Sequence, residues 1–176
     1  MSAVAGPALV ELTQRVSWPC DVATLEGLMM VVPETTHPIA PLSIDRNMAG
    51  QELPILAKSA GMAYIAFVLA AERAALPGLL TQSDDPHDAM AGDPVKAARL
   101  VAATRHRGYA LRQGGLIWPH TGAVALPIRV GRRVIGCINI IWMARVLAYR
   151  EGVSSCLEPL REAQALIERR LAEQAV

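Results

Sequence analysis

One polar residue interrupts the most strand-like apolar run of the chain and is the first candidate for a functional role. Asn139 lies between isoleucines in the segment Cys137-Ile138-Asn139-Ile140-Ile141. A buried amide needs hydrogen-bond partners. Alternation along a strand places Cys137, Asn139 and Ile141 on one face. Two interpretations stay open: this face lines a pocket, or Asn139 faces solvent.

A cluster of small residues is the second candidate. Ser59, Ala60 and Gly61 precede a helical apolar pattern, where a glycine costs roughly 1 kcal/mol relative to alanine. Small side chains let another backbone or a ligand come close. Tight packing of a helix against a sheet is the simpler explanation, and a ligand contact is the alternative.

The residue types that enzymes use are present without a catalytic arrangement. The sequence has no G-x-S-x-G, HExxH, P-loop or G-x-G-x-x-G motif. Cys20, Cys137 and Cys156 are widely spaced and form no CxxC pair, which favours buried, reduced thiols in the cytoplasm. For His37 and His120 we expect surface or hydrogen-bonding roles. We therefore predict no catalytic residue, no metal site, no cofactor and no enzymatic activity.

Charge and length narrow the function classes further. The 176 residues carry a net charge of +1, which gives no reason to expect a nucleic-acid contact by this chain. Arg129, Arg132 and Arg133 flank a predicted hairpin tip, where solvated charges that protect a strand edge are favoured over phosphate binding. The longest apolar run, 61–71, is too short to cross a bilayer. No basic segment precedes an apolar one at the N-terminus, so we expect no signal peptide.

Hydrophobic periodicity predicts the elements that hold these residues. In the first half we expect a helix at 7–16, a hairpin at 19–33, a strand at 39–44, an opening helix at 53–67 and a helical piece at 70–80 broken at Pro77-Gly78. In the second half we expect an exposed loop at 81–92, followed by a helix that Asp93-Pro94 caps and Gly108 ends. After this helix we expect a strand at 109–111, a loop at 112–119, a hairpin at 123–141 and a closing helix at 154–172. Ser155 and Glu158 have capping-box spacing at the start of that helix.

These elements predict one domain. A chain with 52% hydrophobic and 19% charged residues can bury an ample core. About six strands, mostly in hairpins, with helices between and after them predict an α+β fold. The natural architecture is a mostly antiparallel central sheet with helices packed on its faces.

Several motifs, in order, carry a resemblance to a known family. They are Leu53-Pro54, the run from Ser59 to Phe67, Arg107-Gly108-Tyr109-Ala110, and the strand 123–128 followed by a glycine-turned hairpin. This set closely resembles the effector-binding domain of IclR-family transcriptional regulators, over about residues 7–172. The segments 18–24, 34–37 and 41–43 look most like the branch that controls breakdown of aromatic acids such as hydroxyphenylpropionates.

The resemblance implies a GAF-like fold in which the sheet and the opening helix enclose a small-molecule pocket. It implies a linker helix at 1–16, an effector-binding domain at 17–176, and an N-terminal winged helix-turn-helix domain that this chain lacks. We therefore expect a cytoplasmic fragment that contacts DNA only through the missing domain and has no membrane partner. The family works as dimers and tetramers, so we expect a homodimer or homotetramer.

The family's ligand positions can be carried over by alignment. They fall on Ser59, Ala60, Gly61, Arg112, Thr121, Ala123, Asn139 and Ile141, and the flanking loops add Met48 and Trp118. Ile141 departs from the family by replacing a hydroxyl with an apolar side chain, which suits a bulkier apolar ligand. Arg112 departs by replacing an acidic residue. A cation there either pairs with an effector carboxylate or is a solvated loop residue.

The resemblance favours one function. The chain is expected to be a sensor domain that binds an aromatic or other small carboxylate and thereby controls operator binding allosterically. The alternative is a dimerisation or interaction module without a functional pocket.

Overall fold

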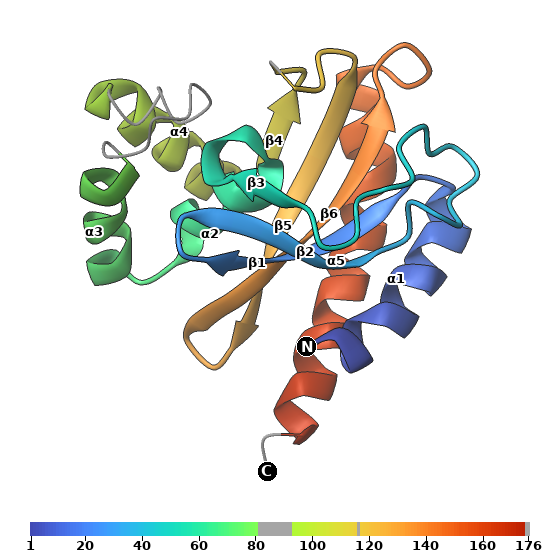
Figure 1. Cartoon of the computed structure of the whole chain (residues 1–176), viewed down its shortest axis with the longest axis horizontal. Coiled ribbons are helices and arrows are strands. Elements are labelled where there is room, and N and C mark those ends of the chain that lie inside the picture. The colour runs from blue at the N-terminus through green and yellow to red at the C-terminus, as the bar shows by residue number, and fades with distance from the viewer. Residues whose placement is uncertain (81–92, 116, 175–176) are drawn as a thin grey trace.

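The computed structural model describes residues 1–80, 93–115 and 117–174, which form one α+β unit around an antiparallel sheet (Figure 1). The predicted fold class is confirmed. The strands are β1 (Cys20–Glu26), β2 (Met29–Thr35), β3 (Glu52–Pro54), β4 (Ala110–Gln113), β5 (Thr121–Val130) and β6 (Arg133–Met143). The helices are α1 (Ser2–Val16), α2 (Ser59–Phe67), α3 (Ala70–Leu80), α4 (Pro94–Arg107) and α5 (Tyr149–Gln174), with a short 3₁₀ turn η1 (Ile55–Ala57) before α2.

The sheet has six strands in the order β3-β2-β1-β6-β5-β4, and each neighbouring pair is antiparallel. Two predicted hairpins supply most of it. Gly27 and Gly131 turn the β1–β2 and β5–β6 hairpins with positive φ values of 61° and 59°, which glycine adopts without steric cost. β1 and β6 are therefore central strands, covered by neighbours along both edges.

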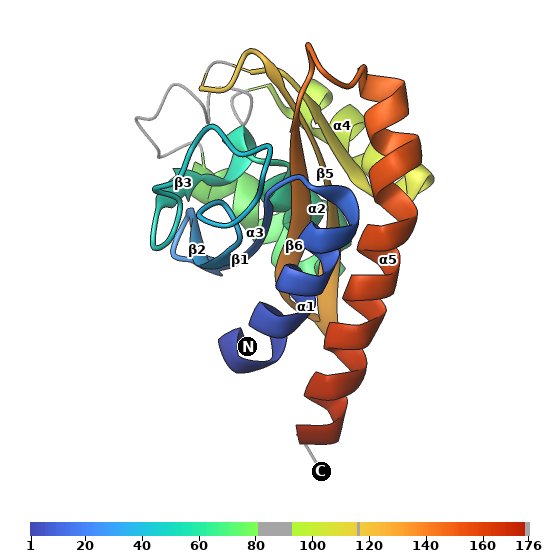
Figure 2. The same cartoon turned by 90° about the vertical axis from the view of Figure 1, so that its right-hand side faces the viewer.

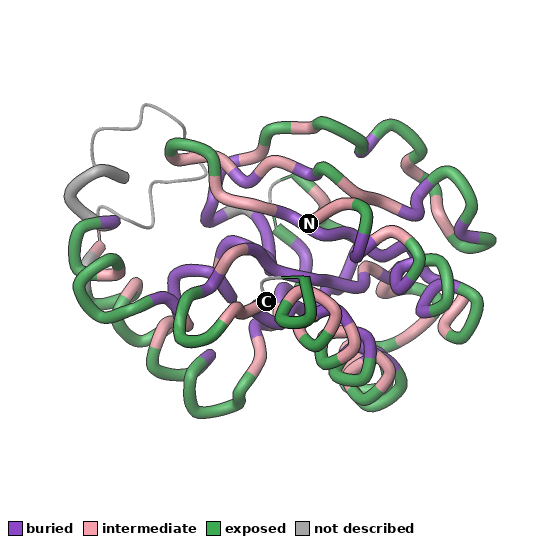
Figure 3. Tube along the Cα trace, turned by 90° about the horizontal axis from the view of Figure 1, so that it is seen from below, coloured by how far each residue is buried: buried purple, intermediate pink, exposed green. Residues whose placement is uncertain are grey.

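Helices cover both faces of the sheet (Figure 2). α1 and α5 pack on one face with the side chains of Leu9, Leu12, Ile140 and Leu160 in a shared apolar core. α2 packs on the other face in a second core, and α4 packs against α2. The buried residues follow the strands and the inward sides of the helices (Figure 3).

The strand predicted at 39–44 is wrong, and the sixth strand lies elsewhere. Residues 36–51 form turns and irregular backbone between β2 and β3. Pro41 lacks the N–H that a sheet ladder needs. Instead β3 pairs with β2, with Met30 opposite Leu53. The opening helix predicted from Leu53 therefore begins only at Ser59.

The structure shows what comes close to Gly61, which the sequence left open between a ligand and another part of the backbone. A Cβ built on this residue would lie 1.7 Å from the backbone oxygen of Ile55. The close approach at Gly61 is therefore made by the backbone of η1, which agrees with the packing explanation.

Helix boundaries differ from the prediction where prolines lie inside helices. α3 continues through Pro77-Gly78, and α5 begins at Tyr149 and accommodates Pro159. The capping box predicted at Ser155 and Glu158 is therefore wrong. α1 likewise begins before Pro7, at Ser2. The loop expected at 81–92 lies outside the described residues.

Other local signals are confirmed. The Asp93 carboxylate accepts hydrogen bonds from the N–H groups of Val95 and Lys96 at the start of α4, and Gly108 ends this helix with φ 81°. At the β5–β6 tip Arg132 is exposed as expected, whereas the guanidinium of Arg129 lies 5.3 Å from the ring centroid of Phe67.

Candidate functional site

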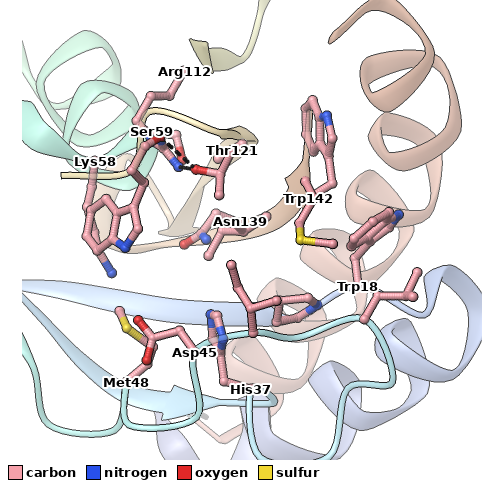
Figure 4. A pocket seen from close by; sticks show the side chains of 17 residues that line it. Trp18, His37, Asp45, Met48, Lys58, Ser59, Arg112, Thr121, Asn139 and Trp142 are labelled. Carbon is pink, nitrogen blue, oxygen red and sulfur yellow. Dashed lines mark hydrogen bonds between the residues drawn. The ribbon is translucent and has the colours of Figure 1, made fainter. Parts of the chain in front are cut away.

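A cavity of about 320 Å³ lies between the sheet, the start of α2 and the 36–51 connection (Figure 4). It is large enough for a small organic molecule, since a cavity of about 150 Å³ can hold benzene. Its lining residues are Trp18, Pro19, His37, Leu42, Ile44, Asp45, Met48, Lys58, Ser59, Arg112, Trp118, Thr121, Ala123, Asn139, Ile141, Trp142 and Met143.

The structure brings most of the predicted site residues together around this cavity. They are Met48, Ser59, Arg112, Trp118, Thr121, Ala123, Asn139 and Ile141. Ala60 and Gly61 do not line it. Ala60 is fully buried in the apolar core on the α2 side of the sheet, and Gly61 is covered by η1. That any of these residues binds an effector stays a prediction.

Asn139 lies on the pocket face of β6, so the solvent-facing interpretation is wrong. Its side chain is buried, and its Nδ2 donates to Asp21 Oδ2 over 3.4 Å across the β1–β6 pair. Its Oδ1 has no hydrogen-bond partner among the described residues. The amide therefore presents an unused acceptor.

Arg112 is a buried cation in β4, not the solvated loop residue of the alternative interpretation. It is 7% exposed. Nη1 donates to the backbone oxygens of Gly114 and Trp118, and Nη2 donates to Thr121 Oγ1. Burial lowers the pKa of the guanidinium to about 10, so it stays charged at neutral pH. Within residues 1–80, 93–115 and 117–174, no carboxylate forms an ion pair with it.

Lys58 is a second buried cation, and sequence analysis missed it. It is 5% exposed and immediately precedes α2. Its Nζ lies 3.9 Å from Asp21 Oδ2 and makes no hydrogen bond within the described part of the chain. Burial lowers the pKa of the ammonium, and the Asp21 carboxylate opposes that shift.

The Trp118 ring lies close to the charged groups of both Lys58 and Arg112. Lys58 Nζ lies 5.7 Å from the centroid of its ring, and the guanidinium carbon of Arg112 lies 5.4 Å from it. Both distances are within the range of cation–π attraction. An aromatic wall and two positive charges therefore lie side by side in the cavity.

Asp21 and His37 form the remaining polar part of the site, and neither was predicted to belong to it. Thr35 Oγ1 donates to Asp21 Oδ1 over 2.7 Å. His37 Nδ1 lies 2.8 Å from Ser43 Oγ, and its Nε2 lies 3.8 Å from Asp21 Oδ1. Asp21 is fully buried. These side chains hold the 36–51 connection against β1.

Some missed residues left a signal in the sequence and others did not. Lys58 is a charged residue inside the most apolar stretch, next to the small-residue cluster, and could have been singled out. Asp21 alternates with Cys20 and Val22, and this pattern gives no sign that the carboxylate is buried. It is buried because β1 is a central strand, a fact that depends on pairing between distant segments.

The described residues hold no group of three or more His, Cys, Asp or Glu side chains that could bind a metal ion. The three cysteines are free and buried. No helix in the described residues is both long enough and apolar enough to cross a bilayer.

Solved structures of known proteins share this fold. A protein of Rhodococcus sp. RHA1 whose proposed role is transcriptional regulation is 22% identical, with a TM-score of 0.81 over 97% of our chain and 69% of its own. An IclR-family transcriptional regulator from Brucella abortus is 19% identical, with a TM-score of 0.77 over 96% and 62%. An IclR homologue of Microbacterium hydrocarbonoxydans, complexed with 4-hydroxybenzoate, is 24% identical, with a TM-score of 0.75 over 96% and 66%.

These likenesses establish the fold. Our chain spans about two thirds of the length of those three structures. No protein-family model matches the sequence.

In chemical terms the cavity is suited to bind a small anion. The lining residues include two basic side chains, Lys58 and Arg112, and one carboxylate, Asp45, and much of the remaining wall is aromatic or aliphatic. A ligand that brings a carboxylate and an apolar body would match both features.

Proposed function

We propose that this chain is the effector-sensing domain of an IclR-type transcriptional regulator and that its cavity binds a small aromatic carboxylate. The resemblance of its motifs supports the family, and the shared fold supports an effector domain. The chemistry of the cavity supports the ligand class. We propose further that such a regulator binds DNA through a separate domain and acts as a homodimer or homotetramer.

One observation carries the proposal. Arg112 is a buried guanidinium with no carboxylate partner among the described residues, and it lies against a cavity. A buried charge is costly unless it is paired. A ligand carboxylate would supply that pair, with charge-assisted hydrogen bonds from the donors that Gly114, Trp118 and Thr121 leave unused.

Two further features of the cavity favour the binding of a ligand carboxylate. Lys58 Nζ makes no hydrogen bond within the described residues and adds a second basic group, 3.9 Å from Asp21 Oδ2. α2 begins at Ser59 on the cavity wall, and the N–H groups at the start of a helix attract anions. These groups all favour a negative ligand over a neutral one.

The apolar part of the wall supports an aromatic body. The side chains of Trp18, Trp118, Met48 and Ile141 line the cavity, and aromatic rings pack favourably against such groups. The bound 4-hydroxybenzoate of the Microbacterium hydrocarbonoxydans protein makes that acid a reasonable first probe for our chain.

Thermal unfolding with a matched pair of ligands tests this function. A ligand that binds only the native state stabilises it by about 2.7 kcal/mol at 100 times its Kd. We expect 4-hydroxybenzoate to raise the melting temperature in a dose-dependent way and the neutral 4-hydroxybenzamide to have much less effect. A panel of aromatic and short-chain acids that gives no shift at millimolar concentration would contradict the proposal.

Two arginine variants test whether the ligand-dependent rise in melting temperature comes from binding in the cavity. Arg112→Met removes the cavity cation, and we expect it to abolish most of the ligand-dependent shift. Arg132→Met removes an exposed charge at the β5–β6 tip, and we expect it to respond like the wild type. An unchanged ligand response in Arg112→Met would place the binding site elsewhere.

The alternative of an interaction module without a functional pocket is disfavoured by the cavity, which the side chains of the described residues leave open. In the proposed regulator, ligand binding controls DNA binding only if the ligand prefers one arrangement of the DNA-binding domains energetically.

A further inference from the structure

We propose that Asn139 and His37 select ligands that carry a hydrogen-bond donor, so that the ligand is a hydroxylated aromatic carboxylate and not merely an aromatic acid. This inference rests on the proposed function. Its basis is a pair of buried side-chain atoms on the cavity wall, Asn139 Oδ1 and His37 Nε2, that have no hydrogen-bond partner in the described part of the chain.

The orientation of the Asn139 amide follows from its partner. Asp21 is a carboxylate, and an ionised carboxylate only accepts hydrogen bonds. The amide nitrogen must therefore face Asp21 Oδ2, as it does at 3.4 Å. This leaves Oδ1 as the free end of the side chain, and an oxygen there can only accept.

The orientation of the His37 ring follows in the same way. Ser43 Oγ donates its hydrogen to the backbone oxygen of Asp45 over 2.8 Å. The serine oxygen can then only accept from His37, so Nδ1 carries the hydrogen in their 2.8 Å contact. In the neutral ring Nε2 is therefore a lone-pair acceptor, and no donor among the described residues bonds to it.

Both acceptors lie around the buried Asp21 carboxylate, since His37 Nε2 is 3.8 Å from its Oδ1. This part of the cavity is rich in acceptors, and Lys58 Nζ, 3.9 Å from Asp21 Oδ2, is the basic group beside them. Figure 4 shows Arg112 and Thr121 on one side of the cavity, His37 and Asp45 on the opposite side, and Asn139 between them. A ligand whose carboxylate pairs with Arg112 therefore turns its other end toward the acceptors.

A hydroxyl group on that end satisfies what the protein leaves unpaired. A ligand without a donor removes any water from these acceptors and gives nothing back, and unpaired buried polar groups are costly. We expect the hydroxylated acid to bind at least about 10-fold more tightly than the acid that lacks the hydroxyl, a difference of about 1.4 kcal/mol.

Titration calorimetry with a small ligand series tests the inference on the whole chain. The series is benzoate, 3-hydroxybenzoate, 4-hydroxybenzoate and 4-methoxybenzoate, titrated at about pH 8, above the ordinary pKa of imidazole. We expect at least one hydroxybenzoate to bind more tightly than benzoate. The methoxy compound should lose this advantage because an ether oxygen accepts but does not donate.

Two variants test whether the preference for a hydroxylated ligand depends on the side chains of Asn139 and His37. Asn139→Leu and His37→Leu each remove one acceptor, and we expect each to bring the affinity ratio of hydroxybenzoate to benzoate closer to one. His120→Leu removes an exposed histidine and should keep the wild-type ratio. The ratio compares two ligands on the same variant, so a general loss of stability does not imitate the effect. If a variant fails to fold, the wild-type ligand series alone still decides.

The outcomes separate this inference from the proposed function. Equal binding of benzoate and both hydroxybenzoates, all dependent on Arg112, would overturn the inference and leave the proposed function standing. Binding of none of these acids would contradict both.

Discussion

At the scale of single residues, the site is defined by charges that the fold buries without fully pairing. Lys58 and Arg112 flank one tryptophan ring, and only Lys58 has a carboxylate nearby. The net contribution of such groups to stability is small or unfavourable. The proposed ligand would complete this pairing.

The three cysteines, unlike the buried cations, are given no functional role, because burial makes their thiols unreactive. Burial raises the pKa of the Cys156 thiol to about 11 and raises those of Cys20 and Cys137 further. We predict that a thiol-specific reagent at about pH 8 modifies none of the three in the native protein, because the reactive thiolate is scarce and covered. Under denaturing conditions all three should react. Rapid native labelling of even one cysteine would show that its burial is wrong.

At the scale of elements, the start of α2 is where the cavity and the core meet. Ser59 lines the cavity, while Ala60 and Gly61 face apolar neighbours or backbone. The division between the cavity-lining and core parts of this helix therefore falls after its first residue.

We predict that Gly61→Ala destabilises the protein by about 3 kcal/mol, the upper end of the usual cost of overpacking, because the new Cβ would meet the backbone oxygen of Ile55 and a backbone atom cannot move aside cheaply. Gly131→Ala is the control. It also replaces a glycine, but nothing lies within 4 Å of the new Cβ, so the cost is only about 1–2 kcal/mol for the left-handed conformation. Urea unfolding measures both values. Equal losses would rule out a steric role for Gly61.

Elements with local signals could be predicted, and elements that depend on a distant partner could not. The β5–β6 hairpin carries Gly131 at its turn, and α4 carries its own cap at Asp93, so both were found. β3 was missed because three residues ending in Pro54 become a strand only by pairing with β2. The same limit hid Asp21 and His37, whose burial follows from strand order and from the path of the 36–51 connection.

At the scale of the whole molecule, α1 belongs to the folded unit. It packs against α5 over the sheet, and Leu9 and Leu12 lie in the core that both helices share. Thr13 Oγ1 also hydrogen-bonds Thr36 Oγ1 at 2.6 Å, which joins α1 to the segment that carries His37. This contact connects α1 to a segment that lines the cavity.

We predict that Leu12→Ala lowers the free energy of unfolding by about 2–5 kcal/mol, as expected when a buried leucine is truncated. The control Val10→Ala lies on the same helix at a position that is 39% exposed, and its effect should stay within about 0.5 kcal/mol. Denaturant unfolding followed by circular dichroism gives both numbers. A Leu12→Ala variant as stable as the wild type would mean that α1 does not pack as described.

The central claim is that the cavity binds an organic carboxylate through Arg112. A crystal structure with 3-bromo-4-hydroxybenzoate tests it most directly, because anomalous scattering locates the bromine. We predict a bromine peak inside the cavity and a carboxylate within hydrogen-bond distance of the Arg112 guanidinium. An empty cavity at saturating ligand, or a carboxylate that faces away from Arg112, would contradict the claim.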